Sequence, residues 1–159
     1  MSPTTRRGLL LASGIALGWV LSLALVVGLD PATTAPVWLV LLVLVRTLLH
    51  TGLFIVGHDA MHGLLMPSHP VANRRLGQAA LLVYAALPYE AILANHRLHH
   101  RHAGTAADPD HHGDGSPHPL AWYRRFMAGY LAPGRVTALV GGWALLAAAL
   151  HLLANGALV

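Results

Sequence analysis

The sequence predicts an all-α protein that is embedded in a membrane as a bundle of about three to four hydrophobic helices. Two properties of the composition support this fold class: 55% of the 159 residues are hydrophobic, and only 10% are charged. Because about a quarter of the residues of a soluble domain are usually charged, much of this surface is expected to face lipid. The whole chain, residues 1–159, is predicted to form a single membrane domain.

The first predicted membrane helix is the uncharged apolar stretch from Leu9 to Leu29. At about 1.5 Å per residue it reaches roughly 31 Å, which matches the thickness of the hydrocarbon core. Arg6 and Arg7 precede it, and the residues around this pair also resemble a twin-arginine export signal. The apolar stretch is longer than a typical signal core, so the sequence favours a first helix that is retained in the membrane.

Three further segments complete the predicted bundle. A helix is expected from Pro36 to His62, with proline in a permitted first-turn position. Residues 76–94 are apolar, and residues 136–153 form a final apolar helix. The polar segment 95–135 is rich in histidine and arginine and is expected on the cytoplasmic side, because arginine is retained there. Arg74 and Arg75 are expected on the same side, so the 76–94 segment must leave and return on that side or lie in the interface.

The charged and sulfur-containing residues exclude two classes of protein. All ten basic residues are arginine, and no stripe of them is interleaved with aromatic residues, so nucleic-acid binding is not expected. The chain has no cysteine, which excludes disulfides and thiolate metal sites.

The first histidine cluster is His58-Asp59-Ala60-Met61-His62. Residues four apart on a helix differ by about 40° around its axis, so both imidazoles share a face and can bind one metal. The alternative is a pair of polar residues at the membrane surface. A zinc protease would need glutamate directly after the first histidine, where this chain has Asp59.

The second cluster contains His96, His99 and His100. On a helix these three imidazoles fall within roughly 100° of arc, whereas His102 points away. The alternative is a solvated histidine-rich loop. Five imidazoles in two clusters, without cysteine, favour iron over a structural zinc site.

Nearby polar residues are predicted to support the metal site. A carboxylate commonly accepts the free ring N–H of a metal-bound histidine, and Asp59, Asp108 and Asp110 are candidates for this role. Asp108 and Asp110 could instead form a polar turn around the intervening proline. His112 is either a further ligand or a solvated side chain.

Two polar residues lie deep in the second predicted helix. Arg46 and His50 occupy positions where charge is costly in a membrane, so both are expected to face the protein interior or a water-lined cavity. For Arg46, a structural partner and a role in a substrate or proton path both remain open.

Four motifs together resemble a known family. The segments GLFIVGHDAMHG, NHRLHH, DPDHH and AWYRRF, between about residues 50 and 130, are similar to bacterial β-carotene ketolases of the membrane fatty-acid desaturase and hydroxylase superfamily. The resemblance implies a desaturase-like helical bundle. It also implies that the iron ligands are His58, His62, His96, His99 and His100, and His112 matches the histidine that closes the family's DPD-x-H element.

The resemblance further implies a reaction. C4 of a carotenoid β-ionone ring is oxidised to a ketone by a non-haem di-iron (Fe²⁺) centre, with O₂ as co-substrate and electrons from ferredoxin. Membrane lipids surround the protein, and the apolar substrate enters from them. The implied location is the bacterial inner membrane, with the histidines on the cytoplasmic side. An acyl-lipid desaturase or hydroxylase with the same metal chemistry is the alternative enzyme.

One element of the family pattern is absent from these residues. The family carries a third histidine box after a further membrane segment, and residues 1–159 contain none. The resemblance therefore implies that the isolated chain is inactive. A non-catalytic membrane remnant or a metal carrier is the alternative from another class of protein.

Overall fold

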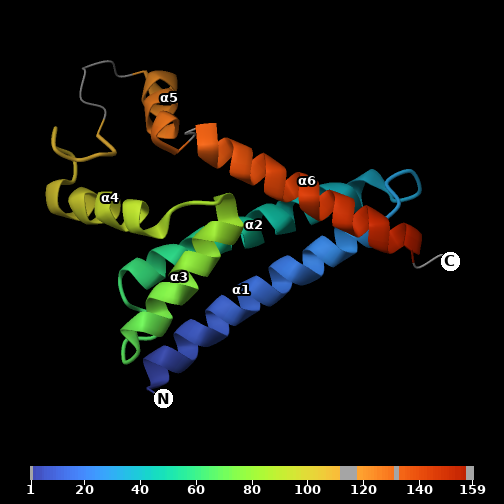
Figure 1. Cartoon of the computed structure of the whole chain (residues 1–159), viewed down its shortest axis with the longest axis horizontal. Helices are drawn as coiled ribbons and strands as arrows, with labels where there is room; N and C mark the ends of the chain where they lie inside the picture. Colours follow the sequence, from blue (N-terminus) through green and yellow to red (C-terminus); the bar gives the residue numbers. More distant parts are fainter. Residues whose placement is uncertain (1, 112–117, 131–132, 157–159) are drawn as a thin grey trace. The chain divides into compact units, whose positions relative to one another are not determined.

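The computed structural model describes residues 2–111, 118–130 and 133–156 (Figure 1). In these ranges the regular secondary structure is entirely helical, and turns and loops connect the helices. The helices are α1 (Pro3–Gly28), α2 (Pro36–Met61), α3 (Pro70–Ala85), α4 (Tyr89–His102), α5 (Pro119–Tyr130) and α6 (Pro133–Gly156). The prediction of an all-α helical fold is thus confirmed.

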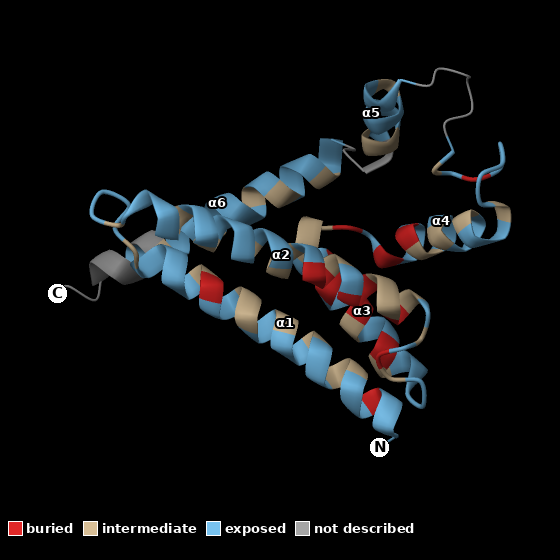
Figure 2. Ribbon diagram, turned by 180° about the vertical axis from the view of Figure 1, so that it is seen from behind, coloured by how far each residue is buried: buried red, intermediate tan, exposed pale blue. Residues whose placement is uncertain are grey.

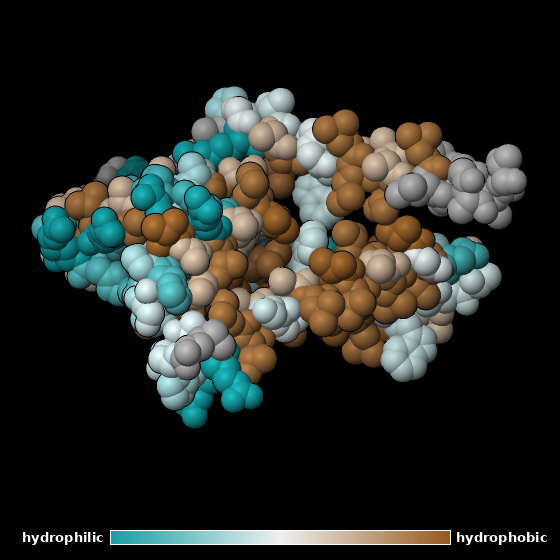
Figure 3. Space-filling model, turned by 60° about the horizontal axis from the view of Figure 1, so that its bottom comes forward, coloured by the Kyte–Doolittle hydropathy of each residue, from teal (hydrophilic) through white to brown (hydrophobic). Residues whose placement is uncertain are grey.

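Within the part of the chain that the structure describes, three helices are long and apolar enough to cross a membrane: α1, α2 and the Pro133–Leu150 part of α6. The shorter α3 and α4 meet the same criterion only when they are taken together, as a broken span or as a re-entrant loop of the kind that the arginines predict. The three to four hydrophobic helices predicted from the sequence are therefore present. Most of their side chains are exposed in the isolated chain (Figure 2), and hydrophobic residues form broad patches on its surface (Figure 3). These surfaces suit a lipid environment.

The chain divides into two compact units, residues 1–84 with α1 to α3 and residues 85–159 with α4 to α6. Whether residues 1–159 act as one membrane domain stays a prediction.

In the first unit α1 and α2 pack antiparallel. Gly18 lies against the side chain of Leu49, and Gly52 lies against Ile15. The later residue of α1 thus contacts the earlier residue of α2, so the two helices run in opposite directions. Small residues at these crossings let the two backbones approach closely, which is how helices commonly associate within membranes.

The polar residues in the middle of α2 are directed at α1. Arg46 Nη1 donates to Ser22 Oγ at 3.1 Å and to the Trp19 carbonyl oxygen at 3.4 Å, and the guanidinium lies 5.6 Å from the centre of the Trp19 ring. The Trp19 indole N–H donates to His50 Nδ1 at 3.1 Å. Both polar side chains therefore face the protein, as predicted for charge at this depth. For Arg46, whose role the sequence leaves open, Ser22 and Trp19 of α1 are structural partners.

Helix α3 also packs against α2. The fully buried Leu81 lies against Gly57, next to the first histidine cluster. The Tyr84 ring lies 4.9 Å from the His50 ring and 5.4 Å from the Phe54 ring, centre to centre. The half of α2 that carries the histidines is thus held by α3.

The contact at Gly57 predicts a destabilised variant. A Cβ added at Gly57 would lie 2.5 Å from Leu81 Cδ2, and Leu81 is fully buried. Gly57→Ala should therefore lower the free energy of unfolding by about 1–3 kcal/mol, the usual cost of overpacking. Denaturant titration of the purified chain in detergent measures this change. Gly14→Ala is the matched control because nothing lies within 4 Å of its added Cβ; an equal loss in both variants would contradict the packing argument.

Several predicted boundaries differ from the structure; for example, α3 begins at Pro70 instead of residue 76, and α6 spans Pro133–Gly156 instead of residues 136–153. Helix α1 begins at Pro3 instead of Leu9, because the Ser2 side chain accepts from the Thr5 N–H at 3.2 Å and proline suits the first turn. The apolar segment 76–94 is broken between α3 and α4, with Pro88 as the N-cap of α4. Proline disfavours helical geometry in the residue before it, so a continuous helix is interrupted there.

Candidate metal centre

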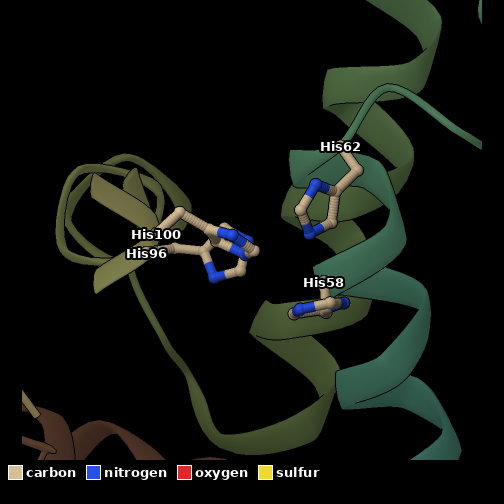
Figure 4. A group of neighbouring side chains, drawn as sticks. All are labelled: His58, His62, His96 and His100. Carbon is tan, nitrogen blue, oxygen red and sulfur yellow. The ribbon is translucent and has the colours of Figure 1, made fainter. Parts of the chain in front are cut away.

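The first histidine pair lies at the end of α2. His58 is in the last turn and His62 is the C-cap residue, and their ring centres are 4.8 Å apart. Figure 4 shows both side chains on the same side of α2. The predicted one-face arrangement of this pair is therefore observed.

Contacts beyond the pair fix the end of α2. Gly63 follows the C-cap residue His62 and has a φ of +73°. This left-handed conformation favours glycine and terminates α2. Asn73, buried on α3, donates from its side-chain amide to the Ala60 carbonyl at 2.7 Å and accepts from the Met66 N–H at 3.1 Å. The turn that carries His62 is thus attached to α3.

The second cluster lies on α4, which extends through His102. The His96 and His100 rings have centres 4.5 Å apart, and Figure 4 shows them as neighbours on this helix. The His99 ring lies 5.9 Å from that of His100. The helical geometry expected for these three residues is therefore present, and the solvated-loop alternative does not describe their backbone.

Asp108 is buried and serves as the hydrogen-bond acceptor of this region. Its carboxylate accepts from the backbone N–H of Gly104 and of Asp110, each at 2.9 Å. It also lies 3.0 and 3.1 Å from Nδ1 of His99. The hydrogen bond from the Gly104 N–H lowers the pKa of Asp108, whereas burial raises it. Together with the contacts to the Asp110 N–H and to His99, the Gly104 bond prevails, and the pKa of Asp108 falls to about 2. The group is therefore a carboxylate at neutral pH.

This contact selects the state of the His99 ring. A carboxylate can only accept, so Nδ1 of His99 carries a proton, and in the neutral ring Nε2 therefore keeps a free lone pair. Carboxylates orient metal-bound histidines in the same way. The loop after α4 can bring Asp108 back to His99 because Gly104, just after the end of the helix, has a φ of +76°. The role of Asp108 beside a metal stays a prediction.

The other two predicted carboxylates are placed differently. Asp110 Oδ2 lies 3.6 Å from Nδ1 of His99, and partial burial raises the pKa of its carboxyl. Asp59 Oδ1 lies 3.6 Å from Nδ1 of His58 and is exposed to about the same degree as that histidine. Both separations exceed normal hydrogen-bond lengths, so Asp108 is the only one of the three, among the described residues, for which a hydrogen bond to a histidine is found.

The remaining candidate residues fall into two groups. His112 lies outside the described residues, so its proposed role stays a prediction. His102 belongs to none of the candidate metal-binding groups found among the described residues. This agrees with the sequence-based prediction that His102 points away from the other three histidines.

The donor set fits a metal that prefers nitrogen ligands. Each helix offers two neighbouring imidazoles four residues apart, and His99 has one nitrogen committed to a carboxylate and the other available. Imidazole suits iron, zinc and copper, and the absence of thiolates argues against a structural zinc site. These histidine groups could therefore bind metal, and their chemistry is compatible with iron.

Sequence reasoning missed Asn73 and Trp19. Asn73 lies in the first turns of α3, before the predicted apolar segment 76–94, and no local pattern predicts that it holds the end of another helix. Trp19 is an ordinary membrane-helix residue in the sequence, and only the pairing of α1 with α2 brings it to Arg46 and His50.

These helices and histidines define the class of the protein. Residues 32–158 match the family model described as fatty acid desaturase, so the chain belongs to the fatty acid desaturase family.

The curated relatives point to one branch of this family. The chain is 42% identical over 120 residues to the β-carotene ketolase of Paracoccus sp. (strain PC1), a match that covers 76% of this chain and 48% of the relative. It is 37% identical over 126 residues to the β-carotene ketolase of Paracoccus sp. (strain N81106 / MBIC 01143), covering 79% and 51%. The zeaxanthin 4-ketolase of Chlamydomonas reinhardtii is 42% identical over 84 residues, covering 52% and 19%.

The chain spans about half the length of the Paracoccus relatives that it matches. No solved structure matches it.

Proposed function

We propose that this chain belongs to a carotenoid ketolase, which oxidises C4 of a β-ionone ring to a ketone. One observation carries the proposal: the 42% identity over 120 residues to a protein named β-carotene ketolase. Any continuous stretch of that length in a chain of 159 residues includes both histidine clusters. The similarity therefore includes the residues that would perform the chemistry.

In this proposal His58 and His62 of α2 and His96, His99 and His100 of α4 bind a di-iron centre, with His112 as a further ligand. Iron bound there would supply the activation of O₂ that oxidation of a C–H bond requires. The protein's contribution is to hold neutral imidazoles in fixed orientations. Asp108 supports this role because its hydrogen bond leaves Nε2 of His99 available.

The reaction balances as two hydroxylations at one carbon. Each consumes O₂, two electrons and two protons, inserts one oxygen atom into a C–H bond and releases the other as water; the resulting geminal diol loses water to give the ketone. The electrons are proposed to come from ferredoxin. The carotenoid is apolar and would reach the histidines from the surrounding membrane lipids, for which the exposed apolar helices are suited.

The proposed location is the bacterial inner membrane, with both histidine clusters on the cytoplasmic side. Two arginine groups support this orientation. Arg6 and Arg7 precede the apolar part of α1, and Arg97 and Arg101 lie on α4 beside the second cluster. Arginine near membrane helices is retained preferentially on the cytoplasmic side.

Expression in cells that produce β-carotene tests the function. The coding region that contains this sequence should convert β-carotene to echinenone and canthaxanthin, measured by chromatography of the pigments. Residues 1–159 expressed alone should leave the pigment unchanged, because the family's third histidine box is missing from them. Unchanged carotenoids in both arms, together with altered membrane fatty acids, would instead favour the acyl-lipid desaturase or hydroxylase that the family match also allows.

A further inference from the structure

The second unit contains a cavity that the proposed reaction does not use. It has a volume of about 130 Å³ and lies between α4, the loop at 109–111, α5 and the first turn of α6. Its polar and aromatic lining consists of Asn95, Asp110, His111, Trp122, Arg125, Phe126 and Arg135. Small-molecule sites usually measure about 300–1,000 Å³, so this cavity suits a single chemical group better than a whole organic ligand.

The cavity lies at the polar end of a membrane helix. The candidate span in α6 begins at Pro133, and Arg135 is in its first turn. On α5, Trp122 stacks on Phe126 with ring centres 5.1 Å apart. Tryptophan and arginine beside a membrane span are typical of the headgroup region. The cavity is therefore expected at the level of the lipid headgroups.

The charges of the cavity favour an anion. Arg125 and Arg135 bring two guanidinium groups, and Asp110 brings one carboxylate. That carboxylate lies 3.6 Å from His99, and the Trp122 indole N–H donates to the Asp110 backbone carbonyl at 3.0 Å. Two positive charges against one negative charge leave the lining net positive. Guanidinium groups bind phosphate through paired hydrogen bonds, which an ammonium cannot do.

We propose that this cavity binds the phosphate of an anionic phospholipid from the surrounding membrane. The two arginines hold the phosphate, and the Trp122–Phe126 face contacts the apolar part of the lipid next to it. A zwitterionic lipid also has a phosphate, but its attached cation would approach the two guanidinium groups and be repelled. The site involves no metal and no oxidation, so it goes beyond the proposed function and stands independently of it.

Lipid titration of the purified chain in neutral detergent tests the proposal. Phosphatidylglycerol, phosphatidylcholine and inorganic phosphate are added separately, and native mass spectrometry counts the lipids retained. One phosphatidylglycerol is expected to bind more tightly than phosphatidylcholine, and inorganic phosphate at the same concentration should not displace it. Arg125→Gln and Arg135→Gln should each weaken binding about fivefold, from the contribution of one arginine near an anionic lipid.

Arg124→Gln is the matched control. Arg124 is exposed, lies next to Arg125 on α5 and does not line the cavity, so its loss should leave the affinity unchanged. Circular dichroism checks that each variant keeps its helices, and Arg125→Lys or Arg135→Lys replaces a glutamine variant that does not fold. Equal binding of the two lipids, displacement by inorganic phosphate, or equal weakening by Arg124→Gln would each overturn the proposal.

Discussion

Replacing His58 or His96 with alanine is expected to abolish iron binding and ketone formation in the protein that contains this sequence. Each residue belongs to a pair of neighbouring imidazoles on its own helix. Losing a residue that only supports a ligand costs about 10–100-fold in metal affinity, and losing a ligand should cost more. Metal analysis of the purified protein measures the iron, and pigment analysis of β-carotene-producing cells measures the product.

His102→Ala is the control for this experiment. It removes an imidazole from the same helix, α4, but from a position outside every candidate metal-binding group of the described residues. Iron content and ketone formation should therefore stay near the unsubstituted level. Full iron content in the His58 and His96 variants would show that these pairs do not bind the metal, whatever the pigments do.

Asp108→Ala should lower the affinity for iron by about 10–100-fold while the protein stays folded. The substitution removes the carboxylate that fixes the proton on Nδ1 of His99 and leaves the N–H groups of Gly104 and Asp110 without this acceptor. Iron affinity is measured by competition with a chelator, and only the folded fraction is analysed.

Asp108→Asn separates the role of charge from that of shape. Asparagine is nearly isosteric and its side-chain oxygen can still accept one of these bonds, but it carries no negative charge. Its iron affinity should lie between that of the alanine variant and the unsubstituted protein. A purely structural role would lower the unfolding midpoint of Asp108→Ala and leave the iron affinity of its folded fraction unchanged, which would contradict the assignment.

The sequence predicted the long helices well because their signals are local. Pro36 and Gly63 flank the apolar run of α2, and the observed helix ends one residue before the expected one. The start of α1 was less accurate because hydrophobicity does not report a cap such as Ser2. The position of the break before α4 was not predicted for a similar reason: residues 76–94 are apolar on both sides of Pro88, although a proline disfavours continuation of a helix. That this segment turns back or lies in the interface was expected from the arginines.

Local spacing by itself determined which histidines share a helix face, because a four-residue interval fixes their angle once the helix forms. It therefore predicted the pair His58–His62 and the cluster of His96, His99 and His100. Only the tertiary structure decided that Asp108, and not Asp59, hydrogen-bonds to a histidine, and that Asn73 holds the end of α2. Such bonds join different segments of the chain, so their lengths depend on how the backbone folds back after Gly63 and Gly104, which no interval in the sequence specifies.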